Sequence, residues 1–269
     1  MKNIITTILL SALIGCGGGS SSENENSTPL ETKDISTRLD DYAANTTIPS
    51  NEDSSQYKVL IFGNSHVIGL ASRLDALIQS AHPEKSLVTK YTGSNDYLQE
   101  RLQHEQSVSL LHTQDWTHVI LQAQKYSQSG SFFYPTRGAE TWIRMAKSLG
   151  ITPVLFPEHP QDGRLFEGEF IYNIHVDIAN TEPACVSPVG LAWESAIKAD
   201  NSLAYHAQDG NHAANTGELL TAMVMYQVIT GDDASTIPYT DAVNEPEEVF
   251  NFLAQIATQT VLDNPPCNF

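Results

Sequence analysis

The sequence predicts an α/β protein built as three layers, in which helices cover both faces of a parallel, flavodoxin-like sheet. Short apolar runs alternate along the chain with longer segments whose apolar residues recur at helical spacing. The runs are hydrophobic at nearly every position, which is typical of parallel strands that are buried on both faces. With 269 residues and a hydrophobic content of 41%, the chain is large enough to build a core on each side of such a sheet.

Each element is predicted from one of these two patterns. A strand is expected at 57–62, because YKVLIF is an apolar run that stops at Gly63. A helix is expected at 67–80, where Leu70, Leu74 and Leu77 fall on one face. The same reasoning gives further strands at 86–91, 117–122, 151–157 and 202–206, and further helices at about 95–111, 137–149, 188–199, 213–229 and 245–262. Residues 158–187 show neither pattern and stay unassigned.

The N-terminus has the layout of a secretory signal. In MKNIITTILLSALIGC one lysine precedes an apolar run that is too short to span a bilayer. The LIGC segment that ends at Cys16 resembles a bacterial lipobox, which implies cleavage before Cys16 and lipidation of its thiol. We therefore expect a signal peptide at 1–15, a lipid-anchored Cys16 and flexible acidic tether at 16–56, and a globular domain at 57–269. An ordinary signal peptide that is cut elsewhere is the alternative.

The charge balance restricts the partners. Lys plus Arg total 14 against 32 Asp plus Glu, which gives a formal net charge of −18. Nucleic acid is excluded as the main partner, because phosphate contacts need clustered cations. Membrane contact is expected only through the lipid anchor, and Gly17 after the cysteine favours the outer membrane of a bacterial cell envelope.

The cysteines point to one structural bond at most. Three cysteines are too few for a disulfide framework, and no C-x-x-C pair suggests a structural metal. In an oxidising compartment Cys185 and Cys267 can form a disulfide that ties the C-terminal tail to the domain, but the sequence does not give their distance. No metal or organic cofactor is expected.

Three residues suited to nucleophilic catalysis follow predicted strands. Ser65 comes directly after the first strand, and Asp209 and His212 follow the last one. Carboxyl ends of parallel strands meet at one edge of a sheet, where active groups gather. A serine needs an imidazole to take its proton, and the imidazole needs a carboxylate that fixes its tautomer. The alternative is that Ser65 caps a helix, Asp209 sits in a turn and His212 lies on the surface.

The two motifs that hold these residues, Gly63-Asn64-Ser65 and Asp209-Gly210-Asn211-His212, resemble the early and late blocks of the SGNH (GDSL-type) hydrolase superfamily. The resemblance implies a three-layer αβα fold, with Ser65 as nucleophile, His212 as general base and Asp209 as its partner. The G-x-S-x-G motif of α/β-hydrolases is absent, because residue 67 is Val.

The resemblance also implies an oxyanion hole made by the Ser65 N–H, a middle glycine and a middle asparagine. Gly93 fits the glycine. The strand that should lead to the asparagine runs instead into Gln122-Ala123-Gln124, so we expect Gln124 as the side-chain donor and Gln122 as second choice. Asn95, in a literal G-x-N-D match, remains open, although it follows the wrong strand. The V-I-L-Q-x-Q string and the D-G-N-H ending resemble an uncharacterised branch of the superfamily.

The expected activity is hydrolysis of an oxygen ester. The chain carries several aromatic residues that could stack on sugar rings, namely Trp116, Phe132, Phe133 and Tyr134. They suggest a short acyl group on polysaccharide as the substrate. Two alternatives stay open: an O-acyltransferase with the same triad, and a non-catalytic lipid-anchored envelope or glycan-binding protein. The remaining histidines are expected at the site edge (His66) or in surface and loop positions (His159, His175).

Overall fold

Five parallel strands form one sheet in the order β2-β1-β3-β4-β5, which is the flavodoxin-like order. The computed structural model describes residues 36–94 and 96–269, so the predictions for the signal peptide, Cys16, the first part of the tether and Asn95 lie outside the described residues. The strands are β1 (Gln56–Gly63), β2 (Ser86–Gly93), β3 (His118–Leu121), β4 (Thr152–Leu155) and β5 (Cys185–Val186). The predicted fold class is confirmed.

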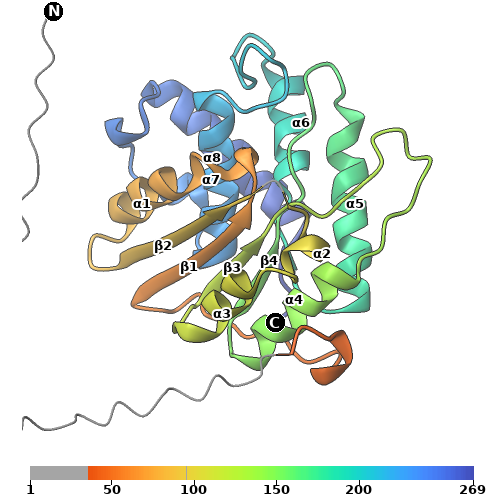
Figure 1. Cartoon of the computed structure of the whole chain (residues 1–269). Coiled ribbons are helices and arrows are strands. Elements are labelled where there is room, and N and C mark those ends of the chain that lie inside the picture. The colour runs from red at the N-terminus through yellow and green to blue at the C-terminus, as the bar shows by residue number, and fades with distance from the viewer. Residues whose placement is uncertain (1–35, 95) are drawn as a thin grey trace, which may run out of the picture. The chain divides into compact units, whose positions relative to one another are not determined.

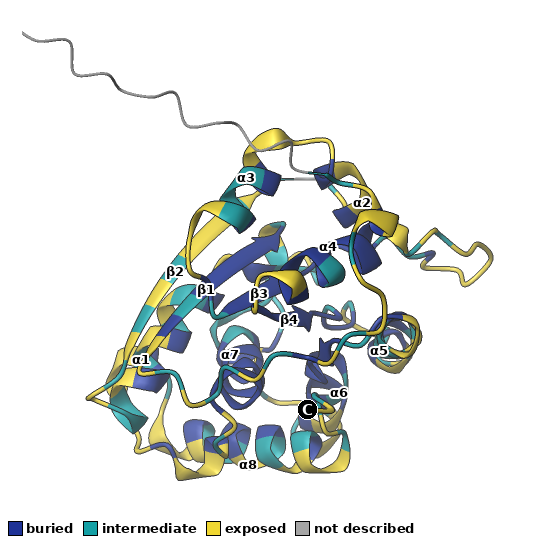
Figure 2. Ribbon diagram, turned by 90° about the horizontal axis from the view of Figure 1, so that it is seen from below, coloured by how far each residue is buried: buried dark blue, intermediate teal, exposed yellow. Residues whose placement is uncertain are grey.

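The strands are buried on both faces because consecutive side chains point to opposite sides. Val59 and Ile61 belong to one hydrophobic cluster, whereas Leu60 and Phe62 belong to the other. This arrangement explains why the strands read as uninterrupted apolar runs. β2 at the sheet edge is the exception, because its residues are exposed or half-buried (Figure 2).

Helices cover both faces of the sheet (Figure 1). One face is covered by α1 (Leu70–Ala81), α6 (Val189–Ala199), α7 (Asn215–Thr230) and α8 (Glu247–Asp263), and the other by α2 (Leu98–Arg101), α3 (Glu105–Thr113) and α4 (Arg137–Ser148). Short 3₁₀ helices occur at Leu39–Asp41 (η1), Ser65–Val67 (η2), Ala234–Thr236 (η3) and Asp241–Val243 (η4). Helix α5 (Phe166–Thr181) packs beside α6 and β5.

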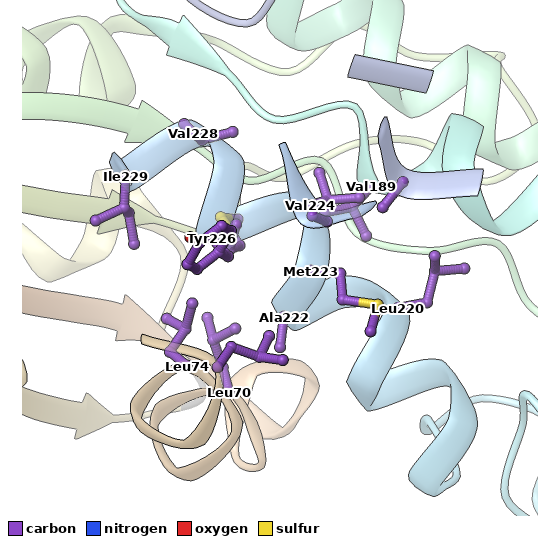
Figure 3. Close-up of a cluster of buried hydrophobic side chains, with 14 of the residues drawn as sticks. Leu70, Leu74, Val189, Leu220, Ala222, Met223, Val224, Tyr226, Val228 and Ile229 are labelled. Atoms are coloured by element: carbon purple, nitrogen blue, oxygen red, sulfur yellow. The ribbon is translucent and has the colours of Figure 1, made fainter. Parts of the chain in front are cut away.

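Helix α7 is the centre of the larger cluster. Nearly all of its residues are buried, because it lies between the sheet and α8 (Figure 2). Figure 3 shows Leu70 and Leu74 of α1 lying opposite Ala222 and Tyr226 of α7. No helix between residues 36 and 269 combines the length and the hydrophobicity that crossing a bilayer requires.

The structure corrects four predicted elements. The fifth strand is Cys185–Val186 and not 202–206, where His206 makes only an isolated antiparallel bridge to Ala213. Part of the unassigned segment is helix α5, whose buried face includes Glu167 and His175 and therefore lacks a plain apolar stripe. The helix expected at 95–111 is divided into α2 and α3, and the one expected at 67–80 is divided into η2 and α1.

The expected tether also needs correction, because its described part, residues 36–56, packs on the domain. Leu39 and Ile48 are buried at 7% and 5% exposure. The Asn51 amide donates to Thr117 O at 3.0 Å and to Thr152 Oγ1 at 2.9 Å. The folded unit therefore begins earlier in the chain than the composition suggested.

The C-terminal tail closes the free edge of β5. Val186 N–H donates to Pro266 O at 2.8 Å, and a disulfide joins Cys185 to Cys267 across 82 residues. A two-residue strand is thereby fixed on both sides, by β4 and by the tail.

Candidate active site

The turn after β1 presents Ser65 at the carboxyl edge of the sheet. β1 ends at Gly63, and η2 begins at Ser65 with Asn64 as its N-cap. The Asn64 side chain accepts a hydrogen bond from His66 N–H at 3.0 Å, which is the role expected of a capping asparagine. Ser65 itself is exposed, so its hydroxyl is accessible to a substrate.

Ser65, His212 and Asp209 lie in one hydrogen-bonded chain. Ser65 Oγ is 2.8 Å from His212 Nε2, and His212 Nδ1 is 2.5 Å from Asp209 Oδ2. The other carboxylate oxygen accepts the backbone N–H groups of Asn211 and His212, both at 3.0 Å. The hydrogen bond from the imidazole, followed by those from the two backbone groups, holds the pKa of Asp209 well below its usual range. The carboxylate is therefore ionised and can fix the tautomer of the ring.

Two loops at this edge hold the Asp209–His212 segment in place. Gly210 has φ +67°, a left-handed conformation that favours glycine, and its carbonyl accepts Asp162 N–H at 2.8 Å. Asn211 O lies 3.0 Å from His159 Nε2, and Asn211 Oδ1 accepts the Gln161 amide at 2.9 Å. The segment after β4 thus supports the histidine and the aspartate.

Histidines gather behind the site. The His66 ring stacks on His212, with centroids 5.4 Å apart and planes at 22°. His159 stacks on Trp193 at 4.0 Å and is 3% exposed; it lies in the loop after β4, so the loop position expected for it is correct and the surface position is not. Burial, followed by the charges of neighbouring histidines, lowers the pKa of His159 to about 3. His175 is also buried, at 2% exposure, within α5.

The structure does not place either glutamine as an oxyanion donor. Both hydrogens of the Gln124 amide go to backbone carbonyls, of Lys125 at 3.0 Å and of Pro135 at 3.2 Å. Gln122 is 1% exposed and offers no surface that a substrate could reach. The Gln122 side chain is instead hydrogen-bonded to the turn that holds Ser65. Gly93 is the last residue of β2 and is in register with Gly63 at the end of β1. Its role as a backbone donor to the oxyanion stays a prediction.

Sequence reasoning missed Glu158 and Tyr91. Glu158 follows β4 and accepts the Gln122 amide at 2.8 Å, while its carboxylate lies 3.9 Å from His66 Nε2. Tyr91 Oη donates to Asn64 O at 3.0 Å. The strand-end rule that selected Ser65 applies equally to Glu158, so this residue could have been found.

The surroundings of the triad are polar and open. A hollow of about 550 Å³ beside Asp209 is lined by Gln161, Asp162, Ala207, Gln208, Gly210 and Asn211. In the loop between β3 and α4, Phe132 and Phe133 are 69% and 98% exposed. Trp116, which was grouped with them from the sequence, is buried in the core and cannot contact a substrate.

Comparisons with solved structures agree with this topology. A DUF4886 family protein from Bacteroides uniformis aligns at a TM-score of 0.59 and 15% identity, over 78% of this chain and 96% of its own. A protein from Slackia heliotrinireducens whose description places it among the SGNH hydrolases aligns at 0.49 and 18%, over 64% and 98% of the two chains. The psychrotrophic esterase EstA from Pseudoalteromonas aligns at 0.47 and 14%, over 65% and 97%. The chain shares the three-layer αβα fold of the Bacteroides uniformis protein. Neither a protein-family model nor a curated protein matches the sequence.

Within this αβα fold the two motifs come together from opposite ends of the domain. The Gly63-Asn64-Ser65 block ends β1, and the Asp209–His212 block lies between α6 and α7. Their 147-residue separation is closed by the single contact between Ser65 Oγ and His212 Nε2. The chemistry available at this point is the removal of a proton from an exposed hydroxyl.

Proposed function

We propose that the protein is a serine hydrolase that cleaves an oxygen ester. The observation that supports this most directly is the hydrogen-bonded chain from the Ser65 hydroxyl through His212 to Asp209, at 2.8 and 2.5 Å. His212 Nε2 takes the proton while Ser65 Oγ bonds to the acyl carbon, and it then returns the proton to the departing alcohol. Water repeats the sequence and releases the acid.

The oxyanion would be held by backbone N–H groups of Ser65 and Gly93. Ser65 is the first residue of η2, a position whose N–H has no partner within the helix. One oxyanion donor contributes a factor of about 10²–10³ to the rate in acyl transfer. The amides of Gln122 and Gln124 have other partners and are not part of this proposed hole.

A short acyl group on carbohydrate is the substrate that we propose. The polar hollow beside Asp209 suits a hydroxyl-rich alcohol, and the exposed Phe132 and Phe133 suit stacking on sugar rings. Acyl transfer to a sugar hydroxyl in place of water would use the same triad, and the exposed position of Ser65 is compatible with such an acceptor.

Fluorophosphonate labelling of the purified full chain tests the proposed nucleophile. Wild type should label, Ser65→Ala should not, and Ser72→Ala should label as wild type does. Ser72 is an exposed serine on α1 whose hydroxyl only donates to Gly69 O, which makes it a matched control. An unlabelled wild type with a normal unfolding transition would favour the non-catalytic, glycan-binding alternative.

Release of acetate from acetylated polysaccharide, compared with hydrolysis of p-nitrophenyl acetate and octanoate, would then define the acyl group and the alcohol. Adding free sugar acceptors distinguishes transfer from hydrolysis. Transfer would give an acylated sugar, whereas hydrolysis would give only the free acid.

We also propose that Cys16 anchors the protein in the envelope membrane through attached lipid, on the basis of the LIGC sequence alone. Cys16→Ala should move the protein from the membrane to the soluble fraction. An unchanged distribution would exclude this anchor.

A further inference from the structure

Asn64, the residue before the nucleophile, is held by three hydrogen bonds that involve side chains. Its carbonyl, Asn64 O, accepts the Tyr91 hydroxyl at 3.0 Å. The preceding N–H, Asn64 N, donates to Gln122 Oε1 at 2.8 Å, and the Asn64 side chain accepts His66 N–H at 3.0 Å. Tyr91 belongs to β2 and Gln122 directly follows β3, and both strands flank β1, so groups from the two neighbouring strands bond to this turn.

The Tyr91 bond helps to fix where the Ser65 N–H points, because Asn64 O accepts the Tyr91 hydroxyl at 3.0 Å in addition to the backbone N–H of Val67 at 3.4 Å. The described peptide bonds are all trans, so the N–H of Ser65 points away from the carbonyl of Asn64 in the same plane. Holding the carbonyl on one side therefore aims the N–H to the other side. Accepting a hydrogen bond at the carbonyl also polarises the N–H, because bonds in a chain strengthen one another.

Gly93 leaves the space that Tyr91 needs. A Cβ atom at Gly93 would lie 2.2 Å from the Tyr91 hydroxyl oxygen, far inside contact distance. Any other residue there would displace the hydroxyl from Asn64. Burial raises the pKa of Tyr91 above its usual value, so the hydroxyl keeps its proton at neutral pH and remains a donor.

Glu158 determines the orientation of the Gln122 side-chain amide. A carboxylate only accepts hydrogen bonds, so the side of the amide that faces Glu158 Oε2 at 2.8 Å must be the NH₂ group. The carbonyl oxygen is then left for Asn64 N–H. Gln122 is almost fully buried, so no water competes for these bonds.

We propose that Tyr91 and the Gln122–Glu158 pair are positioning residues that fix the Asn64–Ser65 peptide and thereby aim the Ser65 N–H at the oxyanion. The inference rests on the proposed function, because it assigns a purpose to a catalytic peptide. An oxyanion forms only in the transition state, so loss of this positioning lowers kcat and leaves KM nearly unchanged.

Tyr91→Phe in the full chain removes only the hydroxyl. We expect kcat to fall about three- to tenfold with KM and the unfolding midpoint close to wild type, on the scale of one neutral hydrogen bond. Tyr239→Phe is the matched control, because its hydroxyl also donates to a backbone carbonyl, Glu245 O, at 3.0 Å and its side chain is likewise 38% exposed. That variant should keep the wild-type kcat. An unchanged kcat in Tyr91→Phe, or a rise in KM alone, would overturn the proposal.

A charge swap tests the Gln122–Glu158 pair. Gln122→Glu alone places two carboxylates against each other and should lower kcat at least tenfold. Combining it with Glu158→Gln restores a donor facing an acceptor and should return kcat to within about threefold of wild type. No recovery in a double variant that folds normally would exclude the positioning role.

The Ser65 amide ¹⁵N resonance gives a readout that does not depend on turnover. Its chemical shift responds to hydrogen bonding at the preceding carbonyl, so it should move in Tyr91→Phe and not in Tyr239→Phe. A stationary resonance refutes the positioning even if the protein has no esterase activity. Absent labelling of the wild type together with a moved resonance would instead refute the proposed function and leave the geometry intact.

Discussion

Lowering the pH from 7 to 5 should destabilise the domain through three histidines that the fold keeps neutral. His118, His159 and His175 are at most 3% exposed. Burial is the largest cause that lowers their pKa values, to about 3 for the first two and about 4 for the third. Within the described residues, His118 Nε2 and His175 Nε2 have no hydrogen-bond partner, so neither site offers an acceptor for an added proton.

The direction in which stability changes with pH follows from the number of protons that the folded and unfolded states bind. In the unfolded chain each imidazole takes up a proton near pH 6.5, whereas the folded chain does not protonate these three above about pH 4. The unfolded state therefore binds more protons, and stability is full above pH 6.5 and falls as the pH is lowered toward 4. Each histidine contributes about 1.4 kcal/mol per pH unit, hence roughly 2 kcal/mol each at pH 5 and about 6 kcal/mol together. This is comparable to the whole stability of a typical domain.

Urea unfolding followed by tryptophan fluorescence at pH 7, 6 and 5 measures the effect. The free energy of unfolding should fall with a slope that approaches three protons, and His118→Asn should reduce that slope by about one third. His112→Gln, on the half-buried side of α3, is the control and should leave it unchanged. A free energy that stays level between pH 7 and 5 would show that these imidazoles are not held neutral, and the reasoning from burial would fail.

Three further predictions concern the triad, the tail and the N-terminal segment. Asp209→Asn should reduce kcat on the order of 10³–10⁴-fold without changing the unfolding midpoint, and near-normal turnover would contradict its role. Replacing Cys185 and Cys267 by alanine opens a loop of 82 residues and should cost about 4 kcal/mol in urea unfolding; a loss below about 1 kcal/mol would contradict this. Glu182→Gln removes a fully buried carboxylate that pairs with Lys147 at 2.5 Å, which should cost about 3–5 kcal/mol. Equal resistance of this variant and wild type to proteolysis near residue 45 would contradict that account.

The sequence predicted the three uniformly buried strands and the edge strand β2, but it missed β5, which is very short, and α5, whose buried face mixes polar and apolar residues. β1, β3 and β4 are apolar runs because both of their faces are covered. β5 has only two residues, too few for any period, and is held by the tail through Pro266 and a disulfide. No local pattern contains such a partner, since it lies at the far end of the chain.

Ser65 was predictable because it follows β1, whereas the strand expected before Asp209 and His212 does not form, and those two residues were found from the Asp209-Gly210-Asn211-His212 block itself. The third expected oxyanion donor was not predictable. A position directly after a strand tells at which edge of the sheet a residue lies, but not in which direction its side chain points. Ala123 has φ +77°, a left-handed conformation that is uncommon outside glycine, and the chain bends there. Gln122 therefore turns under the nucleophile and Gln124 turns into the following loop, although an extended strand would send both to one side.

That bend changes how an oxyanion can be held in this fold. A side-chain donor can adjust its rotamer to a substrate, whereas a backbone donor points wherever its peptide plane points. With the amides of Gln122 and Gln124 bonded elsewhere, the oxyanion hole that we propose consists of the backbone N–H groups of Ser65 and Gly93. The orientation of those peptides then depends on contacts from β2 and β3. Tyr91 occupies the space over Gly93 and also bonds to the carbonyl before Ser65. Among the described residues it is therefore the position at which a small substitution should most directly change the rate without changing binding.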